Sequence, residues 1–225
     1  MGYYLLYFLL ISFIPIWASM RVKNTYATYQ RVPNSSGATG YEIARRILDA
    51  NGLYDVPVVE YEGFLSDHYD PRSKTVRLSS ANYHGRSIAA AAVAAHEVGH
   101  AIQDQKGYAF LRFRTALVPV ANLGSNLSFF FLLIGLILGL MELALLGILF
   151  MAAAVLFQVV TLPVEFNASS RALDQIVSLG IVRPDEERGA RKVLSAAALT
   201  YVAAAAVALM ELLRFILIFT NANRD

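Results

Sequence analysis

Four long apolar runs limit this chain to a membrane fold. They cover residues 1–20, 116–140, 143–164 and 193–219. A helix of about 20 apolar residues matches the roughly 30 Å hydrocarbon thickness of a bilayer. The chain of 225 residues is 56% hydrophobic and only 16% charged, which is unlike an ordinary soluble domain. The sequence therefore predicts a mainly α protein, built as a four-span transmembrane helical bundle in the lipid bilayer.

The distribution of lysine and arginine predicts how the chain is oriented in the membrane. Residues 21–115 hold 12 of these cations and residues 165–192 hold five, whereas the turn at 141–142 holds none. Positively charged loops stay in the cytoplasm, so we expect both loops there and both termini outside. The expected segments are transmembrane helix 1 at 1–20, a cytoplasmic α+β portion at 21–115, a transmembrane hairpin at 116–164, a cytoplasmic helix at 165–192, and transmembrane helix 4 with a tail at 193–225.

Composition also excludes several classes of site. The formal net charge is only +2 and no basic run is present, so we expect no nucleic-acid partner. The chain has no cysteine, which excludes disulfides and thiolate metal sites. A bound metal would need histidine, carboxylate or backbone oxygen ligands.

The first polar segment has the pattern of a small mixed domain. Thr39 and Glu42 form a capping box for a helix that ends near Asn51. Residues 56–59 are strand-like, and a proline within them favours an edge position. A polar turn at 67–73 leads into a second strand at 75–79, which predicts a hairpin. Ser87 is a suitable N-cap for a helix over residues 88–105.

That last helix carries the residues with the clearest chemistry. His96 and His100 are four positions apart, so they project from one helix face and can bind a single ion. Glu97 is placed to take a proton from a water molecule at that ion. A catalytic zinc site needs a third protein ligand, for which His68, His84 and the carboxylates are candidates. Glu165 directly follows the third apolar run, and the hairpin would return it beside the histidines.

These residues resemble a known group of enzymes. The segments His96-Glu97-Val98-Gly99-His100 and Glu165-Phe166-Asn167-Ala168-Ser169, separated by a two-span hairpin, are similar to the integral-membrane zinc metallopeptidases of the gluzincin group. That group includes the HtpX-like bacterial proteases and the CAAX prenyl endopeptidases. With Asp67-His68-Tyr69-Asp70-Pro71 added, the closer likeness is to the YugP-type membrane zinc metallopeptidases.

The resemblance implies a small cytoplasmic zincin-like portion with Zn²⁺ as cofactor. It makes His96, His100 and Glu165 the zinc ligands and Glu97 the general base. The chain departs from the HtpX-like pattern at Ser169, where that pattern has an acidic residue that orients a ligand histidine. A hydroxyl orients a histidine less strongly than a carboxylate, so Asp104 or Asp174 are alternative orienting groups.

The function expected is a membrane-embedded zinc-dependent metalloendopeptidase. It would hydrolyse peptide or membrane-protein substrates at the cytoplasmic face of the cell membrane. We expect the strand at 75–79 to be the edge to which an extended substrate adds. Tyr83, His84 and His68 are candidates for a second oxyanion donor.

A zinc-stabilised but inactive scaffold is the alternative function, which the presence of Glu97 disfavours. A metal transporter is disfavoured because the histidines lie outside the spans. The oligomeric state stays open.

Overall fold

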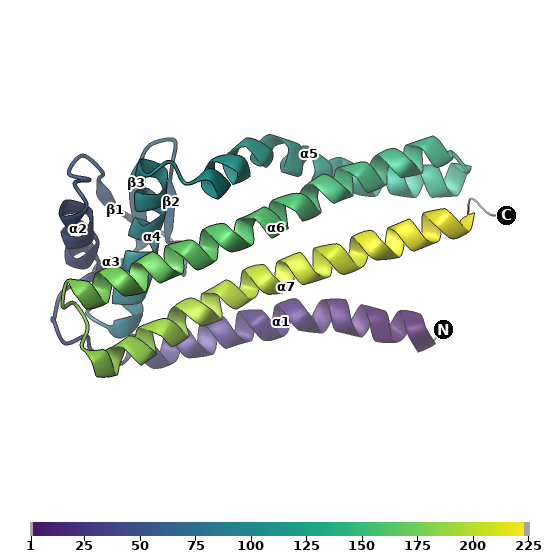
Figure 1. Cartoon of the computed structure of the whole chain (residues 1–225). Helices are drawn as coiled ribbons and strands as arrows, with labels where there is room; N and C mark the ends of the chain where they lie inside the picture. Colours follow the sequence, from purple (N-terminus) through teal and green to yellow (C-terminus); the bar gives the residue numbers. More distant parts are fainter. Residues whose placement is uncertain (1, 223–225) are drawn as a thin grey trace. The chain divides into compact units, whose positions relative to one another are not determined.

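The computed structural model describes residues 2–222 (Figure 1). The helices are α1 (Gly2–Gln30), α2 (Gly40–Ala50), α3 (Ser80–Tyr83), α4 (Ile88–Gln105), α5 (Ala109–Leu138), α6 (Met141–Ser178) and α7 (Pro184–Ala222). The strands are β1 (Val58–Tyr61), β2 (His68–Asp70) and β3 (Thr75–Ser79). Within the described residues, α1, α5, α6 and α7 are long and apolar enough to cross a membrane. The prediction of a mainly α, four-span membrane protein is confirmed.

The chain forms two compact units, and the first is built from residues 2–16, 109–163 and 201–222. In this unit α5 and α6 run side by side as a hairpin (Figure 1). The hairpin turns at Gly139, which has a φ of +68°. A Cβ atom on Gly124 would lie 2.5 Å from the carbonyl oxygen of Phe150 on the facing helix. The absence of a side chain at Gly124 is therefore what lets the two helices approach.

A polar cluster lies in the same apolar unit. The Tyr7 hydroxyl donates to Glu211 Oε1 at 2.6 Å, and Arg214 Nη2 lies 2.8 Å from Glu211 Oε2. The Arg214 guanidinium also lies 5.1 Å from the centre of the Tyr7 ring. Pairing of this kind lowers the cost of polar side chains among apolar helices. The cluster thus joins α1 to α7 within this unit.

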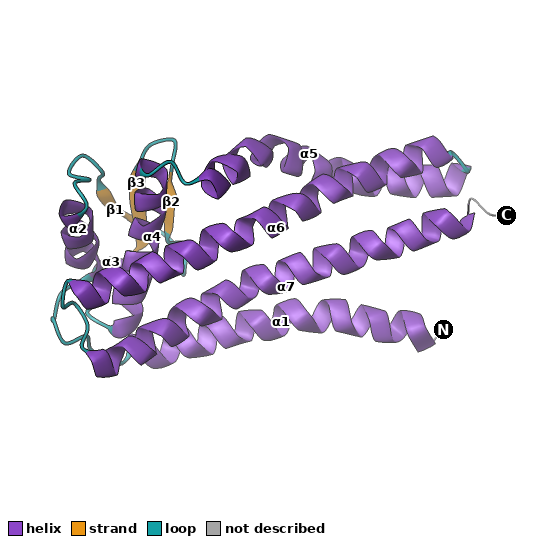
Figure 2. Cartoon of the chain, viewed as in Figure 1, coloured by secondary structure: helices purple, strands orange, loops and turns teal. Residues whose placement is uncertain are grey.

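The second unit consists of residues 17–108 and 164–200 and contains the sheet (Figure 2). The strand order is β1-β3-β2, with β1 parallel and β2 antiparallel to β3. A hairpin is present, but its first strand is β2, which lies within the stretch 67–73 that was predicted to be the turn, and the turn itself is shorter. β1 lies at an edge as Pro57 suggested. The expectation that residues 75–79 form an exposed edge is wrong, because β3 is paired on both sides. After β1 the chain passes to the opposite edge of the sheet, where it forms β2. It then turns back and forms β3 between the two edge strands.

The helices of this unit begin where their capping residues predict. The Thr39 side chain accepts from the backbone N–H of Glu42, and the Glu42 side chain accepts from the backbone N–H of Thr39, so the capping box is formed. Ser87 caps α4 by accepting from the N–H of Ala90. The alanine run of α4 is buried against α2, the sheet and the end of α6. Small side chains are needed there because several elements crowd around one helix.

The later helices extend past the apolar runs. α6 continues without a break to Ser178, and α7 begins at Pro184. The segment at 165–192 is thus divided between two helices by a turn at 179–183. Glu165 consequently lies in the interior of α6, where its backbone is held by regular helical geometry.

Candidate metal centre

The imidazole pair is presented by one face of α4. His96 and His100 have ring centres 4.8 Å apart and meet edge to face. Their side chains are only 12% and 10% exposed. The alanine residues on the other faces of α4 pack against the core, and this packing fixes the helix that carries the two rings. Two imidazoles are therefore fixed side by side at the surface of the core.

Glu165 of α6 completes a three-residue cluster. Its Oε2 atom lies 3.2 Å from His96 Nε2 and 3.6 Å from His100 Nε2. The Glu165 side chain is 3% exposed, and one ligand atom from each residue fits within 4.8 Å of the others. The structure therefore brings together the three residues that the sequence suggested as ligands.

The other histidines make contacts elsewhere. His84 Nε2 lies 3.2 Å from Glu60 Oε2, and both side chains are exposed. His68 Nδ1 contacts the Ser66 carbonyl oxygen at 2.8 Å. Of the third ligands considered from sequence, Glu165 is the one that the structure places against the pair.

A glycine sets the distance between the two helices that carry the cluster. A Cβ atom on Gly99 would lie 2.7 Å from the carbonyl oxygen of Ala168 on α6. Gly99 precedes His100 directly, and Ala168 lies one helical turn after Glu165. The close backbone contact therefore sits beside the cluster and holds α6 near enough for Glu165 to reach both imidazoles.

Gln103 orients His100, and this role was missed from the sequence. Gln103 Nε2 donates to the Val164 carbonyl oxygen at 2.8 Å and to Asn167 Oδ1 at 3.0 Å. Its Oε1 must then be the atom that lies 3.0 Å from His100 Nδ1, so it accepts the Nδ1 proton. The lone pair of His100 is thereby placed on Nε2, toward Glu165. The signal in the sequence was the spacing of three, which places Gln103 beside His100 on one helix.

Ser169 stands in the position of the acidic residue that the resemblance called for. Its Oγ lies 3.2 Å from His96 Nδ1. Asp104, an alternative orienting group, instead accepts from the Tyr69 hydroxyl at 2.8 Å. In the part of the chain that the structure describes, no hydrogen bond joins Asp174 to either imidazole. The Ser169 hydroxyl therefore orients His96, and the Gln103 amide orients His100.

Glu97 is buried beside the cluster, with 8% of its surface exposed. Burial raises the pKa of its carboxyl group to about 7. The neighbouring Glu165 and Asp67 carboxylates act in the same direction on this pKa, whereas the interaction with His96 and a hydrogen bond from the Tyr69 backbone act in the opposite direction. Tyr69 belongs to β2, so this edge strand contacts the carboxylate directly. A cation at the cluster would further favour the charged form of Glu97.

The donor set suits a divalent metal of the zinc type. Two imidazoles and one carboxylate are the ligands of several catalytic zinc sites, which leave the remaining position for water or substrate. The carboxylate is buried and both imidazoles are oriented by hydrogen bonds through Nδ1, the arrangement found around protein zinc ligands. His96, His100 and Glu165 could therefore hold a metal ion.

Comparison with known proteins agrees with this chemistry. Residues 4–220 match the family described as "Putative neutral zinc metallopeptidase". The chain is 56% identical over 212 residues to the "Putative membrane protease YugP" of Bacillus subtilis (strain 168), and the match covers 94% of each chain. No solved structure matches the chain. With a family match over nearly its whole length and a buried His-His-Glu cluster suited to zinc, the chain belongs to the family described in these words.

Proposed function

We propose that this chain is a membrane-embedded zinc metalloendopeptidase, with His96, His100 and Glu165 as zinc ligands and Glu97 as general base. The observation that carries the proposal is that one ligand atom from each of these three side chains lies within 4.8 Å of the others, beside the buried carboxylate of Glu97. A structural zinc site would close its coordination shell with four protein ligands. Among the described residues, only three metal-ligating side chains form this cluster.

Different residues of this chain have separate roles in the proposed peptide hydrolysis. A zinc ion, when bound, supplies a Lewis acid that polarises the peptide carbonyl and makes water more acidic. Glu97 accepts a proton from the attacking water and delivers it to the leaving amine. Gln103 and Ser169 keep the two imidazoles in the orientation that leaves Nε2 free to act as a ligand. Burial of Glu97 and Glu165 limits competition from bulk water.

The substrate strand is assigned to β2 rather than to β3. β3 has no free edge, whereas β2 is paired on one side only. Its residue Tyr69 already contacts Glu97 through the backbone. An extended peptide that paired with β2 would therefore pass close to the general base.

The polar unit is proposed to face the cytoplasm. The 17 lysines and arginines in the two loops at 21–115 and 165–192 favour this orientation by the positive-inside rule. A reporter that is active only in the cytosol, fused to the C-terminus, should be inactive. An active C-terminal reporter would reverse the orientation.

Glu97→Gln tests the proposed activity. The amide cannot accept a proton, so the purified variant should bind zinc as the parent does but lose hydrolysis of casein or a quenched peptide. Glu62→Gln is the matched control, because Glu62 is an exposed glutamate outside the cluster. Glu165→Ala should instead reduce the zinc content at equal expression. Cleavage by Glu97→Gln at the parental rate would show that Glu97 is not the base.

A further inference from the structure

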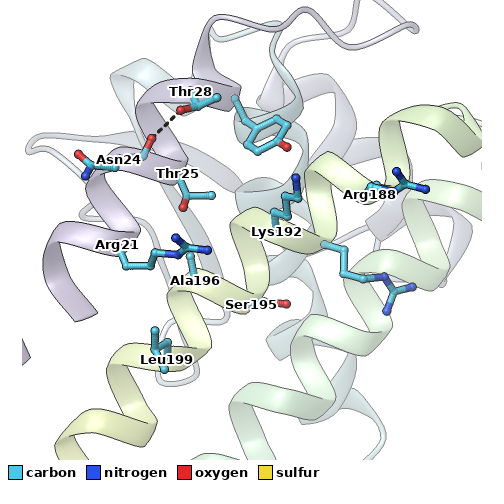
Figure 3. Close-up of a pocket in the computed structure, with 11 residues that line it drawn as sticks. Arg21, Asn24, Thr25, Thr28, Arg188, Lys192, Ser195, Ala196 and Leu199 are labelled. Carbon is cyan, nitrogen blue, oxygen red and sulfur yellow. Dashed lines mark hydrogen bonds between the residues drawn. The ribbon is translucent and has the colours of Figure 1, made fainter. Parts of the chain in front are cut away.

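A basic cavity of about 630 Å³ lies in the second unit, between α1 and the first turns of α7. It is separate from the metal cluster and shares no residue with it. Its polar lining consists of four cations and several hydroxyls, chiefly Arg21, Thr25, Arg188, Arg191, Lys192 and Ser195. In Figure 3, Arg21 and Thr25 from α1 and Lys192 from α7 face the same space. Cations from α1 and from α7, which are far apart in the sequence, thus line the same cavity.

The charge of this cavity is largely uncompensated. Arg191 is paired with Glu187 at 2.6 Å. Over residues 2–222, no carboxylate forms an ion pair with Arg21, Arg188 or Lys192. Like charges repel one another when they are brought together without a counter-charge. The arrangement therefore favours a bound anion.

The hydroxyl groups indicate an oxyanion rather than a simple halide. Thr28 donates to the Asn24 carbonyl oxygen at 2.8 Å, so its hydroxyl is used within α1 (Figure 3). No hydrogen bond within the described residues engages the side chains of Thr25 or Ser195, which can donate into the cavity. Guanidinium groups with hydroxyl donors beside them match the several acceptor oxygens of a phosphate group.

The position of the cavity points to a lipid as the source of that phosphate. Arg21 is the first charged residue after the first apolar run, and Lys192 is the last one before the fourth run. Ala196 and Leu199 form an apolar wall on the α7 side. Trp17 lies one helical turn before Arg21, and tryptophan is typical of the membrane interface. The cavity therefore combines a cationic part with an apolar part at the boundary of two spans.

We propose that this cavity binds the phosphate of an anionic phospholipid headgroup, with the start of the acyl chains against Ala196 and Leu199. Basic pockets between transmembrane helices are suited to such headgroups. A free phosphate ion would use the cations but would gain nothing from the apolar wall. The proposal does not depend on the activity of the metal centre.

Trp17, the single tryptophan of the chain, allows a direct test. The full-length protein is reconstituted into mixed bilayers of phosphatidylglycerol and phosphatidylcholine, with bromine on the acyl chains of one lipid at a time. Bromine quenches nearby tryptophan, so stronger quenching by brominated phosphatidylglycerol at equal mole fraction measures anionic enrichment at the cavity. Arg21→Gln and Lys192→Gln should each lower the relative affinity about fivefold, since one cation near the surface contributes about that factor.

Lys23→Gln is the matched control. It removes the same charge two residues away on α1, at a position that does not line the cavity. The proposal requires that Lys23→Gln keep the enrichment that Arg21→Gln loses, with melting temperature and zinc content unchanged in both. Equal losses in the two variants would mean general surface attraction and would overturn the site. The detergent-solubilised protein is also titrated with inorganic phosphate. Binding of inorganic phosphate together with no preference for phosphatidylglycerol in the bilayer would overturn the lipid assignment.

Discussion

Gly99→Ala is predicted to weaken zinc binding more than it weakens the fold. The added Cβ atom would lie 2.7 Å from the Ala168 carbonyl oxygen, where ordinary contact begins at 3.4 Å. The two helices must therefore separate by about 0.7 Å at this point. Glu165 and Ser169 lie on the same turn of α6 as Ala168, so both move away from the imidazoles.

The expected size of the effect follows from that displacement. Zinc–ligand distances tolerate only about ±0.2 Å, and a misplacement near 1 Å can cost about 100-fold in activity. We expect zinc affinity to fall by at least about tenfold and peptide hydrolysis by about 100-fold. Overpacking costs about 1–3 kcal/mol, but alanine is about 1 kcal/mol better than glycine inside a helix. The free energy of unfolding of the metal-free protein should therefore fall by no more than about 2 kcal/mol.

Gly124→Ala provides the matched control. Its Cβ atom would meet the Phe150 carbonyl oxygen at 2.5 Å, a clash of the same kind between α5 and α6. Zinc affinity is measured by competition with a chromogenic chelator, and stability by thermal unfolding in detergent. Gly124→Ala should lower stability and leave the zinc affinity of the folded protein unchanged. If Gly99→Ala kept parental zinc affinity while losing as much stability as the control, the helix contact would not position Glu165.

Three further outcomes are expected. Ser169→Ala should lower zinc affinity about 10- to 100-fold by freeing the His96 ring, whereas Ser169→Asp should raise it; equal affinity in all three proteins would remove Ser169 from the site. A chelator should lower the melting temperature, because zinc at 100 times its Kd stabilises the folded state by about 2.7 kcal/mol; an unchanged melting curve would argue against tight binding. Thr39→Ala should cost about 1 kcal/mol of stability through the lost capping box with no change in zinc affinity, and a lower affinity would show that α2 shapes the site.

The parts of the site that the sequence predicted are those defined by local spacing. Ser87 marks the start of α4, and a separation of four places His96 and His100 on one face. Glu165 was found because a transmembrane hairpin must return to the side from which it left. In each case the geometry of one element, or of one connection, decides where the residue lies.

The parts that it did not predict depend on contacts between elements. The amide of Gln103 orients His100 only because the Val164 carbonyl and Asn167 of α6 occupy its other atoms. Gly99 belongs to the motif that the sequence analysis identified, but its partner at Ala168 belongs to another helix. Side-chain orientation at a helix crossing depends on the register between two helices, which neither sequence segment specifies by itself.

The order of the strands has the same origin and changes where a substrate can bind. Alternating apolar residues at 75–79 correctly predicted a strand, but a central strand and an edge strand can share that pattern. Burial distinguishes them, since four of the five β3 residues are buried on the two faces of the sheet, whereas β2 is only half-buried. A strand with such burial lies inside a sheet. The free edges of the sheet belong to β1 and β2, and we propose β2 for the substrate because Tyr69 of this strand contacts Glu97.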